Sequence, residues 1–173
     1  MNNYEFTVQI NRPPTAAEYD ALYENGLLDD SGVEESADGR AWIVVDRAAP
    51  TIDDAISSAL NQIRSSGLTP TNIAHNDFVG RATIATRLGV TPQYVHLLTT
   101  GKRGPGGFPV VESSDGWAIY SWSQVADWAR RNLGAVIPED EDAKILAMAD
   151  YLLRAKNLAG DNHQELIRAL IAA

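Results

Sequence analysis

The sequence predicts an α+β protein in three parts. Strand and helix patterns alternate over residues 1–77, and two short helices meet at a glycine early in residues 78–134. Residues 135–173 contain two amphipathic helical patterns. Since each change of pattern coincides with a change of charge, we interpret the three ranges as two domains followed by a C-terminal helical region.

The first part opens with YEFTVQI, in which apolar side chains alternate with polar ones, as in a half-buried strand. A helix is expected after Thr15 and ends at Asn25-Gly26. Asp38-Gly39 then predicts a hairpin. We assign its buried face to Trp42 and Val44, with possible additions from Ile43 and Val45.

Thr51 is typical of the cap of a second helix, and residues 71–78 are a candidate last strand. The resulting order, strand-helix-strand-strand-helix-strand, is typical of a split βαβ sandwich. The sequence therefore predicts a ferredoxin-like domain over residues 1–77.

Charge is distributed unevenly along the chain, whose formal net charge is −9. Residues 1–78 hold 13 acidic and 4 basic side chains, whereas residues 79–131 hold 3 acidic and 6 basic ones. No acid occurs between Val79 and Val111. A nucleic-acid contact is therefore plausible there and nowhere else.

A spacing of small and apolar residues characterises this basic stretch. Ala85, Gly89 and Val95 lie four and then six residues apart. Ala85 allows two helices to cross closely, Gly89 can take positive φ at the turn, and Val95 can pack back. With Thr91-Pro92 as the start of the second helix, the pattern predicts a helix-turn-helix.

The following residues predict a wing and a closing helix. Phe108 to Glu112 and Trp117 to Tyr120 are expected to be extended around a Ser-Ser-Asp-Gly turn. Ser121 and Gln124 fit a capping box for a third helix. We expect the aromatic rings of Trp117, Trp122 and Trp128 to pack in the core or against the wing.

RATIATRLGVTPQYVHLLTTGKRGPGGFPV, followed by GWAIYSWSQVADWAR, resembles the winged helix-turn-helix of bacterial MerR-like regulators and AlpA/excisionase-like DNA-binding proteins. Residues 4–131 resemble bacterial proteins that join an N-terminal α/β domain to this module. MerR regulators proper continue into a long dimerisation helix and an effector site, neither of which is recognisable here. The resemblance therefore implies a winged domain over residues 78–134 that binds DNA without an inducer.

In such folds the second helix, here residues 91–99, enters the major groove. Base edges are then within reach of Gln93, Tyr94, His96 and Leu97, and Thr91 lies near a phosphate. Arg81 and Arg87 on the first helix are expected to contact phosphates. Lys102 and Arg103 are expected beside the DNA backbone or in the adjacent minor groove, with Gly104 and its neighbouring glycines allowing close approach. The alternative for the helix residues is a solvated surface, and for Lys102 and Arg103 an exposed turn.

The expected function is sequence-specific binding of double-stranded DNA by a transcriptional regulator. Alternatives are an excisionase-type DNA-bending factor, an antitoxin-like repressor, or a protein-interaction adaptor whose winged domain no longer binds DNA. We do not expect an enzyme, a cofactor or a metal site. The chain has no cysteine, its three histidines lack ligand spacing, and no phosphate-binding loop or nucleophile motif occurs.

The C-terminal patterns, residues 138–157 and 161–173, present apolar faces that must be covered. They could pack on either domain in cis or form a two-fold interface, and we favour a homodimer. The acidic N-terminal domain could bind a protein partner, self-associate or limit non-specific DNA affinity. No segment is apolar enough for a membrane span, and the start lacks a signal-peptide pattern, so we expect a cytoplasmic, nucleoid-associated protein.

Overall fold

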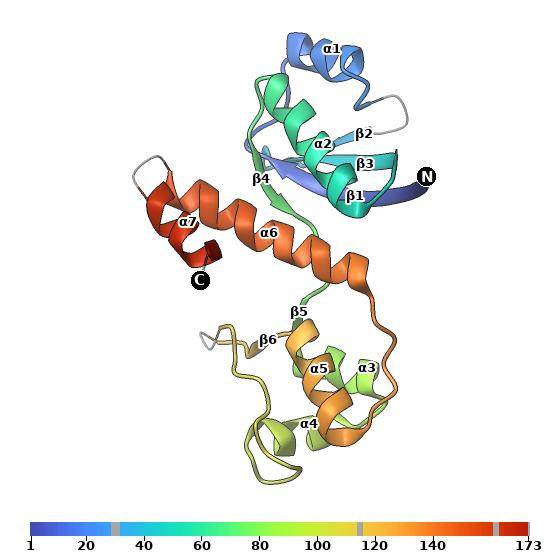
Figure 1. The fold of residues 1–173 in the computed structure, drawn as a ribbon, viewed down its shortest axis with the longest axis vertical. Coiled ribbons are helices and arrows are strands. Elements are labelled where there is room, and N and C mark those ends of the chain that lie inside the picture. Colours follow the sequence, from blue (N-terminus) through green and yellow to red (C-terminus); the bar gives the residue numbers. More distant parts are fainter. Residues whose placement is uncertain (29–31, 114–115, 161–162, 173) are drawn as a thin grey trace. The chain divides into compact units, whose positions relative to one another are not determined.

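The computed structural model describes residues 1–28, 32–113, 116–160 and 163–172, and it has mixed α+β architecture. The chain divides into two compact units (Figure 1). The first comprises residues 1–74 together with residues 145–173, and the second comprises residues 75–144. Most of the region 135–173, which the sequence suggests as separate, is thus grouped with residues 1–74.

The first unit follows the predicted order of strands and helices. Its N-terminal elements are β1 (Asn2–Ile10), α1 (Ala16–Glu24), β2 (Gly32–Glu35), β3 (Ala41–Ala49), α2 (Ile52–Ser65) and β4 (Pro70–Ile73). The four strands form one antiparallel sheet in the order β2-β3-β1-β4. The last strand is shorter than expected, because Phe78 belongs to the second unit.

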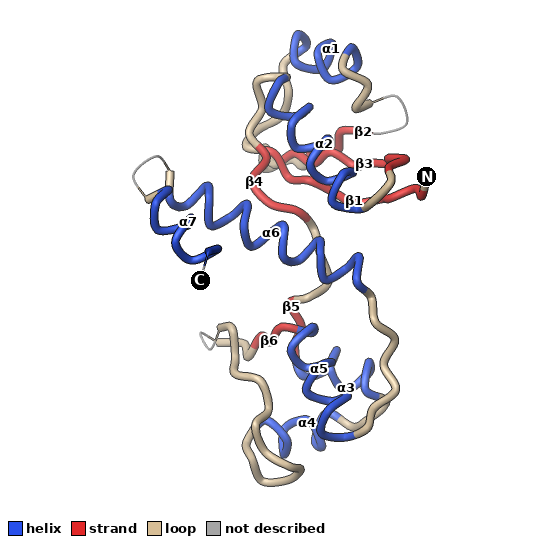
Figure 2. Tube along the Cα trace, in the orientation of Figure 1, coloured by secondary structure: helices blue, strands red, loops and turns tan. Residues whose placement is uncertain are grey.

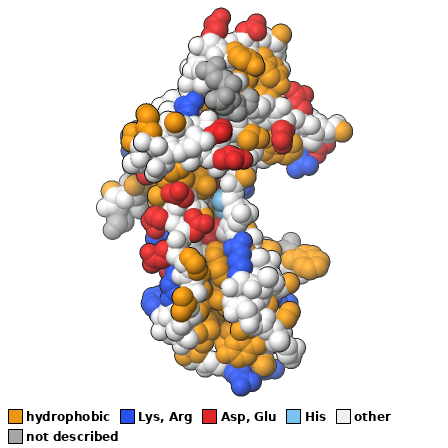
Figure 3. All heavy atoms as spheres, turned by 90° about the vertical axis from the view of Figure 1, so that its right-hand side faces the viewer, with side chains coloured by type: hydrophobic (Ala, Val, Ile, Leu, Met, Phe, Trp, Pro, Cys, Tyr) orange, Lys and Arg blue, Asp and Glu red, His pale blue; other side chains and the backbone are white. Residues whose placement is uncertain are grey.

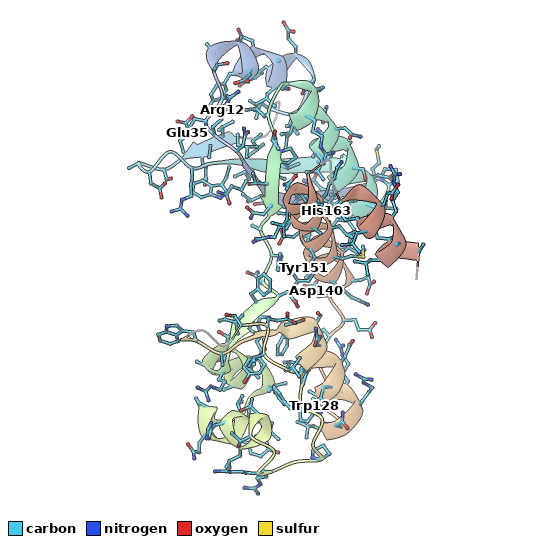
Figure 4. All side chains as sticks on the ribbon, turned by 90° about the vertical axis from the view of Figure 1, so that its left-hand side faces the viewer. Arg12, Glu35, Trp128, Asp140, Tyr151 and His163 are labelled. Atoms are coloured by element: carbon cyan, nitrogen blue, oxygen red, sulfur yellow. The ribbon has the colours of Figure 1, made fainter. Side chains whose placement is uncertain are left out.

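Local polar contacts start both helices where the sequence predicts. Thr15 caps α1 and forms a capping box with Glu18, which also pairs with Arg12 at 2.7 Å (Figure 4 labels Arg12). Arg12 and the Thr15 backbone together lower the pKa of Glu18 to about 2. Thr51 caps α2 by accepting from the Asp54 N–H at 3.2 Å.

The buried face of β3 differs from the main expectation. Ile43 and Val45 are fully buried, whereas Trp42 and Val44 are only half-buried. The segment AWIVV is apolar at every position, so alternation could not select the face. Together with β1 and α2, Ile43 and Val45 form the main core of this unit.

The C-terminal part of the chain forms two further helices, α6 (Glu141–Ala159), whose residues 141–144 belong to the second unit, and α7 (Gln164–Ala172). From Ile145 onward α6 packs on the first unit, where Leu153 is buried and Ile145, Leu146 and Ala149 contact the core. The buried Asp150 accepts a hydrogen bond from the Ile73 N–H at 2.7 Å. Since β4 is an edge strand, this contact covers part of an edge that would otherwise be exposed.

The second unit begins with β5 (Phe78–Gly80) and continues with α3 (Arg81–Leu88), α4 (Pro92–Thr99), β6 (Ile119–Ser121) and α5 (Trp122–Leu133). Strands β5 and β6 pair antiparallel, and a long loop separates α4 from β6 (Figure 2). The buried Asp77 accepts from the Ser123 N–H at 2.6 Å and so helps to cap α5. No helix in the described part of the chain is long and apolar enough to cross a membrane.

The packing of α6 predicts unequal effects of two neighbouring leucines. Leu153→Ala should destabilise the protein by about 2–5 kcal/mol because it opens a cavity in the core. Leu152, which is 43% exposed, should tolerate the same change with a loss below about 1 kcal/mol. Urea denaturation of the two variants measures the difference, and equal losses would contradict the docking of α6.

Candidate nucleic-acid interface

The turn between α3 and α4 has the geometry that its residue spacing predicts. Gly89 ends α3 in the left-handed conformation with φ of 66°, and the Val90 N–H donates to the Ala85 carbonyl at 2.9 Å. Ala85 and Val95 are buried in one core cluster with Ile84. The turn therefore holds α3 and α4 at a fixed mutual orientation.

Thr91 begins α4, and its side chain accepts from the Tyr94 N–H at 3.2 Å. Thr91 and Gln93 are exposed, whereas Tyr94, His96 and Leu97 are half-buried. Tyr94 packs against the cluster of Leu98 and Trp128. Of the proposed base-contacting residues, Gln93 is thus the one with the most accessible side chain.

Backbone hydrogen bonds join the predicted basic loop to the end of α4. The N–H groups of Lys102 and Arg103 both donate to the Leu97 carbonyl, at 3.0 and 3.2 Å. Their side chains are exposed, and the Arg103 guanidinium lies 5.7 Å from the centre of the Tyr94 ring. Neither cation forms a salt bridge within the described residues.

The loop is held on its other side by α5. Trp128 donates its indole N–H to the Gly106 carbonyl at 2.9 Å, and Phe108 packs edge-on against Trp128 at 4.9 Å between ring centres (Figure 4 labels Trp128). The predicted strand Phe108 to Glu112 is therefore wrong, since an isolated bridge between Ser113 and Ile119 is all that pairs near it, and the predicted strand Trp117 to Tyr120 is observed as β6 at Ile119–Ser121. Aromatic packing draws Phe108 toward the core, and ladder bonding begins at Glu112, whose N–H donates to Ile119.

Gly104 has a more local role than the close approach to DNA that we expect from the sequence. Its φ is +85°, and a Cβ on it would lie 2.6 Å from Leu98 Cδ2. Leu98 is itself almost fully buried. The packing of the loop against α4 thus accounts for a glycine at this position.

The two arginines of α3 lie in different surroundings. Arg81 contacts His96 of α4, with 3.1 Å between Nη1 and Nδ1. Arg87 instead stacks over Trp122 at 4.8 Å and donates to the Asn76 carbonyl. Arg81 therefore contacts the predicted recognition helix, whereas Arg87 contacts Trp122 and Asn76 instead.

A cavity of about 370 Å³ surrounds the Arg87 and Trp122 pair. Besides Arg87, its lining includes five acids and two bases, namely Asp77, Asp127, Glu139, Asp140 and Glu141 with Arg130 and Lys144. A phosphate beside Arg87 would have to approach these carboxylates, which makes Arg87 a poorer phosphate ligand than Lys102 or Arg103.

Basic side chains gather at the end of the second unit that carries α4. On the face in Figure 3, that end shows Lys and Arg atoms and no Asp or Glu atoms.

Trp117, expected to be packed, is 82% exposed, and the tip residues 114–115 of the predicted wing lie outside the described residues. No group of three His, Cys, Asp or Glu side chains able to hold a metal is found in the described parts of the chain.

No protein-family model, curated protein or solved structure matches this chain. The geometry of the second unit is therefore the basis for its interpretation.

Two glycines of the loop provide a matched test of its packing. Gly104 and Gly106 both have positive φ, but only a Cβ at Gly104 would meet another atom within 4 Å. Gly106→Ala should cost about 1 kcal/mol from backbone strain, and Gly104→Ala about 1–3 kcal/mol more because Leu98 must move. Thermal or urea unfolding measures both, and an equal cost would show that the loop does not press on Leu98.

Proposed function

We propose that this chain is a sequence-specific double-stranded DNA-binding protein that acts as a transcriptional regulator. The observation that carries the proposal is the pair of exposed cations Lys102 and Arg103, which form no salt bridge within the described residues, on a loop tied to both α4 and α5. Cations held in a fixed position beside a helix can bind phosphates with little loss of conformational freedom.

The proposal assigns the second unit to the winged helix-turn-helix class, similar to MerR-like and AlpA/excisionase-like proteins. The left-handed Gly89 turn, the short pair of helices and the β5-β6 pairing before α5 support this assignment. For the first unit, the strand order β2-β3-β1-β4 with two intervening helices supports a ferredoxin-like arrangement.

In the proposed complex, α4 enters the major groove with its N-terminal half toward the bases. Gln93 reads a base edge, and Thr91 lies near a phosphate. Arg81 is placed beside His96, so it can contact the backbone that borders the same groove. Lys102 and Arg103 contact phosphates and add affinity without sequence preference.

Lys102→Ala combined with Arg103→Ala should weaken binding to specific and random DNA by a similar factor. The slope of log K against log salt should fall by about 2, since two phosphate contacts are lost. Mobility shifts at several salt concentrations would measure this, using fragments from upstream of the protein's own gene and a random fragment of equal length.

The matched control is Arg64→Ala with Lys156→Ala, which removes the same charge from exposed positions of the first unit. This variant should keep the wild-type salt slope. A wild-type protein that gives no salt-sensitive shift would refute DNA binding, and equal losses in the two double variants would refute the assignment to the loop. Gln93→Ala should reduce base preference at one position by about 1–3 kcal/mol.

We also propose a homodimer, with α7 as its interface. The apolar face of α6 is less available for a dimer interface than expected, because much of it packs on the core of the first unit. In α7, Leu166, Leu170 and Ile171 are 58%, 69% and 65% exposed. Leucines one turn apart form a continuous stripe on a helix, which a second copy could cover.

Light scattering should therefore give twice the mass of one chain for the wild type. Leu166→Glu with Leu170→Glu should give a single chain with unchanged circular dichroism. A wild-type protein that remains a monomer at high concentration would exclude the dimer. This result would not affect the DNA-binding proposal, which the mobility shifts test.

A further inference from the structure

Arg47 is a charged residue on the core face of β3, where the other residues are apolar. In β3 the core face carries Ala41, Ile43, Val45 and Ala49, all buried. Arg47 lies on the same face, since side chains two residues apart point to the same side of a sheet. It is half-buried, whereas the other residues of this face are buried and apolar.

The charge of Arg47 is not neutralised by the described residues. Among the described residues no salt bridge involves it, and its Nη1 donates to the hydroxyl of Ser58 on α2 at 2.9 Å. Burial lowers the pKa of Arg47 from its ordinary value. A bound carboxylate could therefore pair with this partly desolvated guanidinium.

A cavity of about 700 Å³ lies beside this guanidinium. Its volume is within the range of small-molecule sites. Polar groups come from α2, namely the side chains of Ser57, Ser58 and Asn61, and the apolar part of the wall includes Leu27 and Pro50. The wall thus combines hydrogen-bonding groups with an apolar surface for a ligand's hydrocarbon part.

Asp54 of α2 also lines the cavity, and its carboxylate accepts from the Thr51 hydroxyl at 2.8 Å. Asp46 belongs to the lining too, but it alternates with Arg47 along β3 and accepts from the Asn3 amide, so its carboxylate lies on the opposite face of the sheet. The cavity thus presents one guanidinium and one carboxylate, and a ligand with charges of both signs could pair with both.

We propose that this cavity binds a free α-amino acid. The ligand's carboxylate pairs with the Arg47 guanidinium, which matches its planar geometry, and accepts from the Ser58 hydroxyl. Its ammonium group lies toward Asp54, and its side chain rests on the apolar part of the wall. This inference concerns the first unit and does not depend on DNA binding by the second.

The test is thermal unfolding of the full chain with each standard L-amino acid in turn. The ligand that binds should raise Tm by about 5–10 °C at roughly ten times its Kd. For L-leucine, the matched probes are 4-methylpentanoate, which lacks the amine, and 3-methylbutylamine, which lacks the carboxylate. Neither should stabilise the protein as the amino acid does, and analogous pairs serve for other side chains.

Arg47→Met separates binding from structure, because it removes the charge and keeps much of the side-chain volume. The variant should lose the ligand-induced rise in Tm, while its own Tm stays equal to or above that of the wild type. Arg64→Met, an exposed change of the same type on α2, should retain the rise.

Three results would overturn the proposal. The first is that no amino acid raises the Tm of the wild type. The second is an equal rise with the carboxylate probe alone, which would indicate a simple anion site. The third is a rise that persists in Arg47→Met, which would place the ligand elsewhere.

Discussion

The hydrogen bond from the Trp128 indole to the Gly106 carbonyl is the constraint on which the second unit's surface depends. Several glycines with positive φ would otherwise leave this loop with many conformations. Trp128 and Phe108 hold one side of the loop, and the Leu97 carbonyl holds the other through two N–H groups. The exposed cations between these anchors therefore have a position relative to α4 that a free loop would lack.

A similar constraint operates in the first unit, where residues far apart in sequence complete one fold. The sheet ends in β4, an edge strand with backbone groups available for pairing. Asp150 accepts from Ile73, and the Asn157 amide donates to the Pro70 carbonyl at 2.9 Å. Helix α6 thus satisfies edge groups with side chains rather than with another strand, so the acidic N-terminal segment depends on the C-terminal helix for its full core.

Local sequence patterns predicted much of the fold. The predictions failed where contacts between residues far apart in the sequence determine the structure. Ala85, Gly89 and Val95 could be interpreted correctly because a tight turn requires those residue types at that spacing. The face of β3 could not, since AWIVV is apolar throughout and only the sheet's partners select Ile43 and Val45. For the same reason the sequence alone did not assign Arg47 to the core face of β3. Its possible role in binding follows only from that assignment. Phe108 was misassigned because its partner, Trp128, is twenty residues away in sequence.

Arg87 and Arg103 show why a basic stretch in a sequence does not define a basic surface. Both come from the same acid-free stretch, and both lie over an aromatic ring. Arg87 lies over Trp122 in a cavity lined by five acids and two further bases, whereas Arg103 lies over Tyr94 without an ion pair among the described residues. Because nearby carboxylates offset the field of a cation, the two arginines differ in their capacity to attract a phosphate. The surface that could attract a phosphate is therefore smaller than the acid-free stretch of sequence indicates, and the proposed DNA contact is concentrated at the glycine-rich loop.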